Sequence, residues 1–501
     1  MSDDTFTPTP EQEAIVKLGT SSDSNLMIEA LAGAAKTSTL VLLAHALRGQ
    51  DILCLAFNKK IKLEMEERLP DWCTSSTLNS LGHRAFGSFI HRKIYLNKAK
   101  NYHILKQWIE DNLDGDDKEY FWEHLYEDTK DALGKAKSAG YVPEDVLAQR
   151  SNFKSLMTDE EFEEWLDFEA DPLQLAAIRE CLATSIDMAM MEAHIDYDDQ
   201  IYISTLCTSV SFRYHSIVLI DEAQDLSALN HEMLWKITRR GKARLIAVGD
   251  QCQAIYGFRG AHQDSMELLA ERFNPMTRMP LTISFRCPRT VVGEALWRAP
   301  TMRYPEWAIE GRVRKLAGWD VDALPDQATI ICRNNAPLFN MAITLFANGR
   351  HAKLAAGDIS KYFLKILEGL GSPDMKIDDV NTALDLWLER ERAKRKDGDR
   401  VNDIAACLRI ITTREEVRNL ADCVTDLKTL FARTGPIELM TGHRSKGLEF
   451  PHVFILDKQL LRIDKEQQEK NLLYVMQTRA TESLTYIETE KFLGRTAEDR
   501  T

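Results

Sequence analysis

Short hydrophobic runs rich in β-branched residues alternate with amphipathic helical stretches near both ends of the chain. This alternation is typical of parallel α/β units. The predicted strands fall into two groups and cover residues 26–30, 52–57, 217–220, 245–248, 329–332, 437–440, 453–456 and 484–487. The pattern therefore predicts an α/β protein whose strands form two separate sets.

Two long stretches, roughly residues 88–192 and 360–435, show helical periodicity with many charges, which indicates helical insertions. The sequence contains no repeat of fixed period and no low-complexity linker. We expect a first core and a second core, each interrupted by an insertion, with the boundaries 1–87, 88–192 and 193–276, then 277–359, 360–435 and 436–501.

The 501 residues, 44% hydrophobic and 28% charged, fit a globular protein of about two to four domains. A formal net charge of −14 argues against binding of nucleic acid through overall positive charge, so any path for nucleic acid must be a local basic groove. Lys59, Lys60 and Lys62 are candidates for such a groove, whereas the basic run at 390–396 is better interpreted as a solvated helix face.

The nine cysteines are scattered without a Cys-x-x-Cys pair, so we interpret them as reduced residues of a cytoplasmic protein without a zinc site. The acidic start of the chain does not resemble a secretory signal. No apolar run approaches the roughly 18 residues of a membrane helix, and we expect no membrane partner.

The segment at 26–38 predicts a strand, a turn of small residues, and a helix-forming stretch at 40–47. Backbone N–H groups in such a turn can close around phosphates, while Lys36 reaches the β and γ phosphates and the Thr37 hydroxyl holds Mg²⁺. The predicted ATP-binding loop consists of Ala32, Gly33, Ala34, Ala35, Lys36, Thr37 and Ser38. The usual pattern has glycine at positions 30 and 35, so this segment alone could also be an ordinary strand–turn–helix junction.

A second element, residues 216–225, is a hydrophobic strand that ends in carboxylates, where an α/β sheet exposes its ligand site. Asp221 is placed to hold Mg²⁺, and Glu222 is placed to orient or deprotonate an attacking water. An acidic helix N-cap after a strand is common in isolation. Together with Lys36 and Thr37, the pair favours a site for ATP hydrolysis.

Further motifs follow in a fixed order. The carboxylate segment is followed by VGDQCQAIYGFRGA at 248–261, and the remaining motifs are TPEQ at 9–12, AFNKK at 56–60, TLNSLG at 77–82, DYDD at 196–199, SFR at 284–286, TGHRSKGLEF at 441–450 and LYVMQTRA at 473–480. This ordered set resembles the UvrD/Rep family of superfamily 1 helicases over nearly the whole chain. The two helical stretches are the parts that it covers poorly.

The resemblance implies a P-loop NTPase fold of two RecA-like parallel-sheet cores, each with a mostly helical insertion, with ATP in the cleft between the cores. It implies Mg²⁺-dependent ATP hydrolysis that drives 3′-to-5′ movement on single-stranded DNA and unwinding of duplex DNA. The implied partners are single-stranded DNA and single/double-strand junctions, with replication or repair proteins as further candidates.

The resemblance also implies roles for residues of the nucleotide site. Gln12 would read the adenine, Phe285 would stack on it, and Glu449 would join the ATP-binding residues. Gln253, Arg286 and Arg479 would contact the γ-phosphate and complete a catalytic set with Lys36, Asp221 and Glu222. Arginines supplied by a second domain neutralise charge that develops in the transition state, so the assignment is physically consistent.

Tyr256 and Phe258 alternate with small residues and could stack on successive bases, each worth about 1–3 kcal/mol. Paired aromatic residues in isolation are more often core residues. The resemblance favours stacking, and it implies further DNA contacts from Phe57, Thr77, Asn79, Arg259, Thr441 and His443.

Two positions depart from the family pattern, since Ala35 replaces a glycine and Ser38 stands where the family often carries an arginine. We expect Ala35 to adopt the right-handed region and ATP binding to survive. Two alternatives stay open: a translocase or protein remodeller that does not separate duplexes, and a module that ATP holds closed on DNA without turnover. The second insertion is short, which predicts weak processivity.

Overall fold

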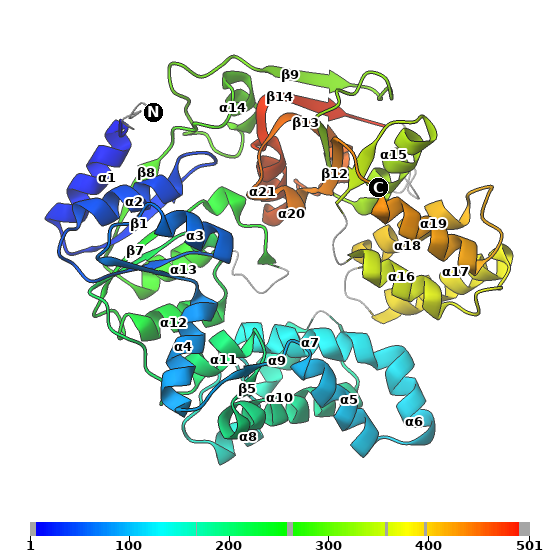
Figure 1. Ribbon diagram of the computed structural model, residues 1–501, viewed down its shortest axis with the longest axis horizontal. Helices are drawn as coiled ribbons and strands as arrows, with labels where there is room; N and C mark the ends of the chain where they lie inside the picture. Colours follow the sequence, from blue (N-terminus) through cyan, green and yellow to red (C-terminus); the bar gives the residue numbers. More distant parts are fainter. Residues whose placement is uncertain (1–6, 167, 258–263, 356–358, 395–397, 490–501) are drawn as a thin grey trace. The chain divides into compact units, whose positions relative to one another are not determined.

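The computed structural model describes residues 7–166, 168–257, 264–355, 359–394 and 398–489 (Figure 1). The chain forms two compact units. One comprises Met1–Leu31, Ala35–Leu166 and Ala170–Leu281, and the other comprises Ala32–Ala34, Asp167–Glu169 and Thr282–Thr501. Each unit is built on a six-stranded sheet in which every pairing is parallel. The predicted α/β class with two sets of strands is confirmed.

The sheet of the first unit has the strand order β3-β2-β6-β7-β1-β8. Its strands are β1 (Asn25–Ala30), β2 (Ile52–Leu55), β3 (Cys73–Ser76), β6 (Ile217–Ile220), β7 (Arg244–Gly249) and β8 (Met276–Leu281). Every residue of β2 and β6 is buried. Strands covered on both faces are continuous hydrophobic runs, which is why the sequence pattern identified them.

The sheet of the second unit has the order β11-β12-β10-β13-β14-β9. Its strands are β9 (Arg312–Leu316), β10 (Ala328–Cys332), β11 (Ala352–Leu354), β12 (Ile437–Thr441), β13 (Phe450–Leu456) and β14 (Ala480–Ile487). The central strand β10 is buried throughout, and it pairs with β12 and β13. This sheet therefore brings together segments more than a hundred residues apart in the sequence.

Four strands of these sheets were not predicted, namely β3, β8, β9 and β11, and all four lie at sheet edges. Edge strands have an exposed side, so polar residues are tolerated there and no hydrophobic run marks them. Most residues of β8 and β9 are indeed partly or fully exposed. The predicted strand at 52–57 was too long, because β2 ends at Leu55 and Phe57 is already exposed.

Helices cover the first sheet and continue into the insertion. The helices near the sheet are α1 (Pro10–Ser21), α2 (Lys36–Ala46), α3 (Lys59–Glu66), α4 (Leu78–Ile90), α11 (Asp199–Leu206), α12 (Ala228–Ile237) and α13 (Ser265–Arg272). The insertion contains α5 (Lys100–Asn112), α6 (Gly115–Tyr120), α7 (Tyr126–Ala139), α8 (Glu144–Gln149), α9 (Asp159–Trp165) and α10 (Pro172–Glu192). Val146 and Ile186 of the insertion share one hydrophobic core with the strands, so the insertion is not packed as an independent body.

The second unit has a comparable arrangement. Its helices are α14 (Arg289–Ala295), α15 (Asn335–Ala347), α16 (Ile359–Gly369), α17 (Ile377–Lys394), α18 (Asp399–Thr412), α19 (Leu420–Ala432), α20 (Gly442–Ser445) and α21 (Gln467–Gln477). Helices α16 to α19 form the second insertion, and their core is continuous with that of the sheet. None of the helices in the described parts of the chain has the length and hydrophobicity needed to span a membrane.

A buried ionic cluster connects the first insertion to the start of α11 and the residues just before it. Lys100 Nζ lies 2.6 Å from Asp199 Oδ2, and Lys137 Nζ lies 2.6 Å from Asp196 Oδ2 and 2.7 Å from Asp199 Oδ1. Three of these four side chains are fully buried. Removal of one partner from such a cluster leaves an uncompensated buried charge, so the cluster fixes the backbone of residues 196–199.

Candidate functional site

The predicted phosphate-binding loop lies between β1 and α2, at the carboxyl edge of the first sheet. The helix begins at Lys36, four residues earlier than the predicted stretch at 40–47. Ala35 has φ 55° and ψ 43°, so the expectation of a right-handed conformation was wrong. The left-handed region costs an L-residue about 1–2 kcal/mol, which explains the advantage of glycine at this position.

Four predicted catalytic and metal-binding side chains meet beside this loop. Lys36 Nζ lies 3.3 Å from Glu222 Oε2, and Thr37 Oγ1 donates to Asp221 Oδ2 at 2.7 Å. Asp221 and Glu222 directly follow β6, whose neighbours β2 and β7 also end at this edge. The sheet therefore places the carboxylates opposite the loop, as the two sequence segments predicted.

Charge in this cluster is unbalanced. Burial lowers the pKa of Lys36, but the carboxylates of Glu222, Asp250 and Asp221 outweigh burial and raise it overall. Burial, and next the charge of Glu222, raise the pKa of Asp221 to about 6. Three carboxylates around one ammonium leave an excess of negative charge with oxygen donors, and hard divalent cations such as Mg²⁺ prefer oxygen ligands. Thr37 and Asp221 therefore fit a Mg²⁺ site.

Gln253 joins the same cluster through Asp250. Gln253 is buried in a 3-10 turn after β7, and its Nε2 donates to Asp250 Oδ2 at 2.6 Å. Asp250, which the sequence analysis did not identify, is buried and contributes to the field at Lys36. The signal for it was present, because Asp250 comes two residues after the predicted strand at 245–248, and Asp221 directly follows the one at 217–220.

Gln12 and Ser38 make contacts at the start of α2. Gln12 is buried, and its Nε2 donates to Thr39 Oγ1 at 3.0 Å in the first turn of α2. Arg68 Nη2 donates to Ser38 Oγ at 2.9 Å. A guanidinium thus stands beside the position where the family often carries an arginine, although Arg68 lies far from the loop in the sequence and no local signal predicted it.

The second unit brings together three other predicted residues. Arg286 Nε and Nη2 lie 2.7 and 2.5 Å from Glu449 Oε1. Arg479 is fully buried, and it donates to the carbonyl oxygens of Val475 at 2.8 Å and Leu448 at 3.1 Å. Burial, and next the charge of Arg286, lower the pKa of Arg479 to about 10. The carboxylate of Glu449 opposes this effect and offsets part of the repulsion between the two arginines.

Phe285 precedes this arginine pair and stacks on Trp307, with ring centroids 6.2 Å apart. Residues Ala32–Ala34 belong to the same unit, and the Phe285 N–H donates to Gly33 O at 2.9 Å. A Cβ atom on Gly33 would lie 2.7 Å from Arg286 Cβ, so only glycine fits this close approach. Trp307, 69% exposed, was not predicted and extends the aromatic surface of Phe285.

Three predicted DNA-binding residues, Phe57, Asn79 and Tyr256, line one pocket of about 210 Å³ in the first unit. Asp198 and Asp225 line it as well. Phe57 is 48% exposed, which suits a ring that stacks on a base. The structure thus assembles residues from three motifs at one place.

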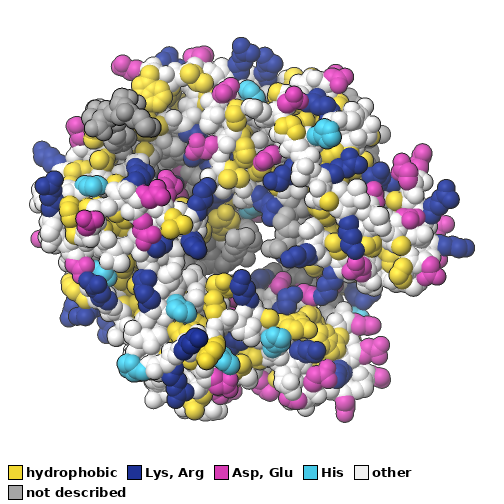
Figure 2. Space-filling view, viewed as in Figure 1, with side chains coloured by type: hydrophobic (Ala, Val, Ile, Leu, Met, Phe, Trp, Pro, Cys, Tyr) yellow, Lys and Arg dark blue, Asp and Glu magenta, His cyan; other side chains and the backbone are white. Residues whose placement is uncertain are grey.

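The remaining predicted DNA contacts are positioned as follows. Thr77 caps α4 by accepting from the Ser80 N–H at 3.1 Å, and Asn79 Nδ2 donates to the carbonyl of Tyr197, a residue that is 46% exposed and was not predicted. Thr441 and His443 lie in the second unit, at the carboxyl end of β12 and in α20. Phe258 and Arg259 lie outside the described residues. On the face in Figure 2, Lys and Arg side chains are interspersed with Asp and Glu side chains.

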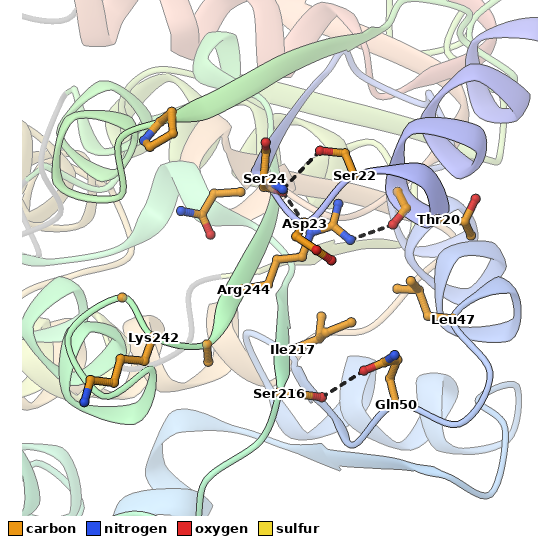
Figure 3. A pocket seen from close by; sticks show the side chains of 15 residues that line it. Thr20, Ser22, Asp23, Ser24, Leu47, Gln50, Ser216, Ile217, Lys242 and Arg244 are labelled. Atoms are coloured by element: carbon orange, nitrogen blue, oxygen red, sulfur yellow. Dashed lines mark hydrogen bonds between the residues drawn. The ribbon is translucent and has the colours of Figure 1, made fainter.

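A larger pocket of about 420 Å³ lies at the opposite edge of the first sheet, beside the amino ends of β1, β6 and β7 (Figure 3). Arg244 crosses it and donates to the carbonyls of Gly19 at 2.6 Å and Ser24 at 2.8 Å. Ligands of doubly wound sheets bind at the carboxyl ends of the strands. This pocket contains no predicted site residue, and the candidate site is the cluster at the carboxyl edge.

Comparison with known families agrees with this geometry. Residues 9–274 match the model of the UvrD/REP helicase N-terminal domain, which covers more than half of the chain. The chain belongs to the UvrD/Rep helicase family. Residues 436–487 match the UvrD-like helicase C-terminal domain. The predicted P-loop NTPase fold is thereby confirmed.

Individual relatives are distant. The F-box DNA helicase protein 1 of Schizosaccharomyces pombe is 24% identical over 95% of this chain and 57% of its own length. A probable DNA helicase of Mycoplasma pneumoniae is 23% identical over 49% of this chain and 46% of its own length. The ATP-dependent DNA helicase Rep of Escherichia coli is 31% identical over 18% of this chain and 15% of its own length. The chain spans about half the length of the first two relatives.

Proposed function

We propose that this chain is an ATP-driven motor that moves 3′ to 5′ along single-stranded DNA and separates duplex DNA ahead of it. The observation that carries the proposal is the cluster of Lys36, Thr37, Asp221 and Glu222 beside a phosphate-binding loop. The same unit contains the aromatic pocket of Phe57 and Tyr256. Family membership supports this combination of an ATP site with a DNA site.

In the proposed reaction, the loop N–H groups and Lys36 bind the β and γ phosphates of ATP. Thr37 and Asp221 would hold Mg²⁺, which supplies charge neutralisation at the phosphates. Glu222 orients the attacking water and accepts its proton, and Gln253 contacts the γ-phosphate. Arg286 and Arg479 neutralise charge that develops as the γ-phosphate leaves, while Gln12, Phe285 and Glu449 complete the nucleotide contacts.

DNA binding is proposed to rest on stacking and on local contacts. Successive bases stack on Phe57 and Tyr256, with Phe258 as a further ring, because stacking tolerates any sequence. Thr77, Asn79, Arg259, Thr441 and His443 contact the strand. Single/double-strand junctions are the proposed loading sites, and replication or repair proteins are the proposed partners.

The decisive experiment measures ATP hydrolysis without nucleic acid, with single-stranded DNA and with single-stranded RNA. Strand displacement is then measured on duplexes that carry a 3′ or a 5′ single-stranded tail. The proposal expects DNA-stimulated hydrolysis and displacement of short duplexes with a 3′ tail. A requirement for a 5′ tail would refute the polarity, and hydrolysis that DNA leaves unchanged would refute the motor.

A second candidate is a translocase that strips proteins from DNA without unwinding. It is favoured by the second insertion, whose four helices α16 to α19 lie within residues 359–432 and pack on the core of their own unit. A small insertion offers little surface for holding a duplex. Robust hydrolysis and removal of a bound protein block, without displacement of any duplex, would establish this candidate.

Replacement of Tyr256 by alanine is expected to weaken single-strand binding about tenfold, because stacking contributes about 1–3 kcal/mol per base. Fluorescence anisotropy with a labelled oligonucleotide measures the dissociation constant, and DNA-free ATP turnover should keep its order of magnitude. Tyr102→Ala, at an exposed tyrosine of α5, is the matched control and should bind normally. Global unfolding of the Tyr256 variant would show that the ring is a core residue.

Single-strand binding should also strengthen about threefold as the pH falls from 7 to 5. Burial, and next the charge of Asp196, raise the pKa of Asp198 to about 6, against the opposing charge of Lys137. Asp198 lines the pocket, so its protonation removes negative charge near the bound strand. Asp198→Asn should bind more tightly at pH 7 and lose this pH dependence. An unchanged pH profile in the variant would contradict the assignment.

A further inference from the structure

Gln224 lies at the junction between the catalytic carboxylates and the turn after β7. Its side chain is fully buried and makes three hydrogen bonds, of which the one to Asp225 Oδ2 is long at 3.5 Å. The Nε2 atom donates to Glu222 Oε2 at 2.5 Å, and the Oε1 atom accepts from the Asp250 N–H at 2.9 Å. These partners fix the orientation of the amide, since a carboxylate can only accept and a backbone N–H can only donate.

The packing around Gln224 is equally specific. A Cβ atom on Gly249 would lie 2.7 Å from Gln224 Oε1 and 3.1 Å from its backbone N, so residue 249 must lack a side chain for Gln224 to occupy its place. Glu222 itself has φ 55°, a left-handed conformation that is unfavourable for glutamate. The surrounding contacts therefore hold Glu222 in a position that its own backbone does not favour.

The two segments that Gln224 connects, residues 222–225 and 250–256, both extend to the aromatic pocket of Phe57 and Tyr256. Asp225, the residue after Gln224, lines the pocket of Phe57 and Tyr256. Asp250 accepts from Gln253, and Tyr256 follows three residues later. A displacement of either segment when a base enters the pocket would move Gln224, and with it the hydrogen bond to Glu222.

Glu222 also has a competing partner, Lys36, at 3.3 Å. In the proposed reaction Lys36 binds the phosphates of ATP in place of Glu222. The Glu222 carboxylate must then face the attacking water. The amide of Gln224 would continue to donate to Glu222 in that state. This hydrogen bond would limit the orientations that the Glu222 carboxylate can adopt toward the water.

We infer that Gln224 is a positioning residue that transmits occupancy of the aromatic pocket to Glu222, so that stimulation of ATP hydrolysis by single-stranded DNA depends on it. This inference rests on the proposed function. Gln224 touches neither the nucleotide nor the DNA in this assignment and acts through Glu222 and Asp250. Its signature is a reduced ratio of DNA-stimulated to DNA-free turnover, with the affinity for DNA preserved.

Two variants test the inference with the volume of the side chain retained. Gln224→Met removes all of these hydrogen bonds, whereas Gln224→Glu keeps an acceptor for the Asp250 N–H and sets a second carboxyl group against Glu222 in place of the amide donor. In both, the stimulation ratio with a single-stranded oligothymidylate should fall about tenfold. The dissociation constant for the oligothymidylate and the KM for ATP should stay within about twofold of wild type.

Ser265→Ala is the matched control, because Ser265 Oγ donates to Ala223 O at 2.7 Å and supports the same turn without touching Glu222. It should lower thermal stability and keep the stimulation ratio. Gly249→Ala adds a Cβ atom that displaces the Gln224 side chain, so it should lower the stimulation ratio as the Gln224 variants do.

Four outcomes are separable in this design. Normal stimulation in folded Gln224→Met and Gln224→Glu overturns the inference, and so does an equal loss in Ser265→Ala. If Gln224→Met does not fold, the ratio of DNA-stimulated to DNA-free turnover in Gln224→Glu and Gly249→Ala tests the inference instead. If the wild-type chain hydrolyses ATP but DNA does not stimulate it, the proposed function fails and the inference fails with it.

Discussion

Replacement of Glu222 by glutamine is expected to lower DNA-stimulated ATP turnover about a thousandfold, a loss of about 4 kcal/mol of transition-state stabilisation. The amide keeps the shape of the side chain and its contact with Gln224, but it cannot accept a proton from water. Because Lys36 and Thr37 are unchanged, ATP and single-stranded DNA should still bind. Steady-state phosphate release gives the turnover, and equilibrium binding of a fluorescent ATP analogue gives the affinity.

The control for this variant is Glu267→Gln, an exposed carboxylate of the same unit that pairs with Arg278. Exposed ion pairs contribute about 0–1 kcal/mol, so this variant should hydrolyse ATP normally. If Glu222→Gln keeps more than about a tenth of wild-type turnover, a loss below about 1.4 kcal/mol, Glu222 does not act on the water. The remaining candidates would then be Asp221 and Asp250, the other carboxylates near Lys36.

The buried parts of the fold could be predicted from the sequence, and the edges could not. Strands β6 and β10 are hydrophobic along their whole length because both faces of each sheet are covered. The edge strands β8 and β9 have one unpaired side and carry charged residues, so their sequences give no periodic signal. Their pairing depends on neighbours that are distant in the sequence.

The candidate site shows the same division. Asp221 and Glu222 directly follow a strand, and Lys36 and Thr37 begin a helix. Local sequence determines these positions, and the prediction grouped the residues that the structure places in contact. Contacts between residues that are distant in the sequence had no local sequence signal. Arg68 beside Ser38 is the example, since only the fold determines that they meet.

Ala35 illustrates a different limit. The sequence identified the departure from glycine, but the backbone conformation of the loop could not be read from composition. The structure places Ala35 in the left-handed region, so the loop carries a strain of about 1–2 kcal/mol that a glycine would relieve. The strain lies in the backbone and not in the side chains that bind phosphate, so it leaves the chemical assignment of Lys36 and Thr37 in place.

Replacement of Arg286 by alanine is expected to lower ATP turnover about a thousandfold with little effect on nucleotide affinity, as for arginines that neutralise charge only in the transition state. Its guanidinium is bound to Glu449, whose side chain is 51% exposed, so the fold should tolerate the change. The measurement compares kcat with the dissociation constant for a non-hydrolysable ATP analogue. Near-normal turnover would mean that Arg286 does not act on the γ-phosphate.

Arg479 requires a different variant, because it supports the fold as well. Its guanidinium donates to the carbonyls of Val475 and Leu448, and a hydrogen bond from a charged group contributes about 1.5–3 kcal/mol. Arg479→Ala should therefore lower both turnover and thermal stability, whereas Arg479→Lys keeps the charge and loses the fork of donors. If Arg479 acts on the γ-phosphate, the lysine variant should recover part of the turnover that the alanine variant loses, when both are compared below their unfolding temperatures. Equal turnover in the two variants would assign Arg479 to the scaffold and leave Arg286 as the single arginine of the proposed reaction.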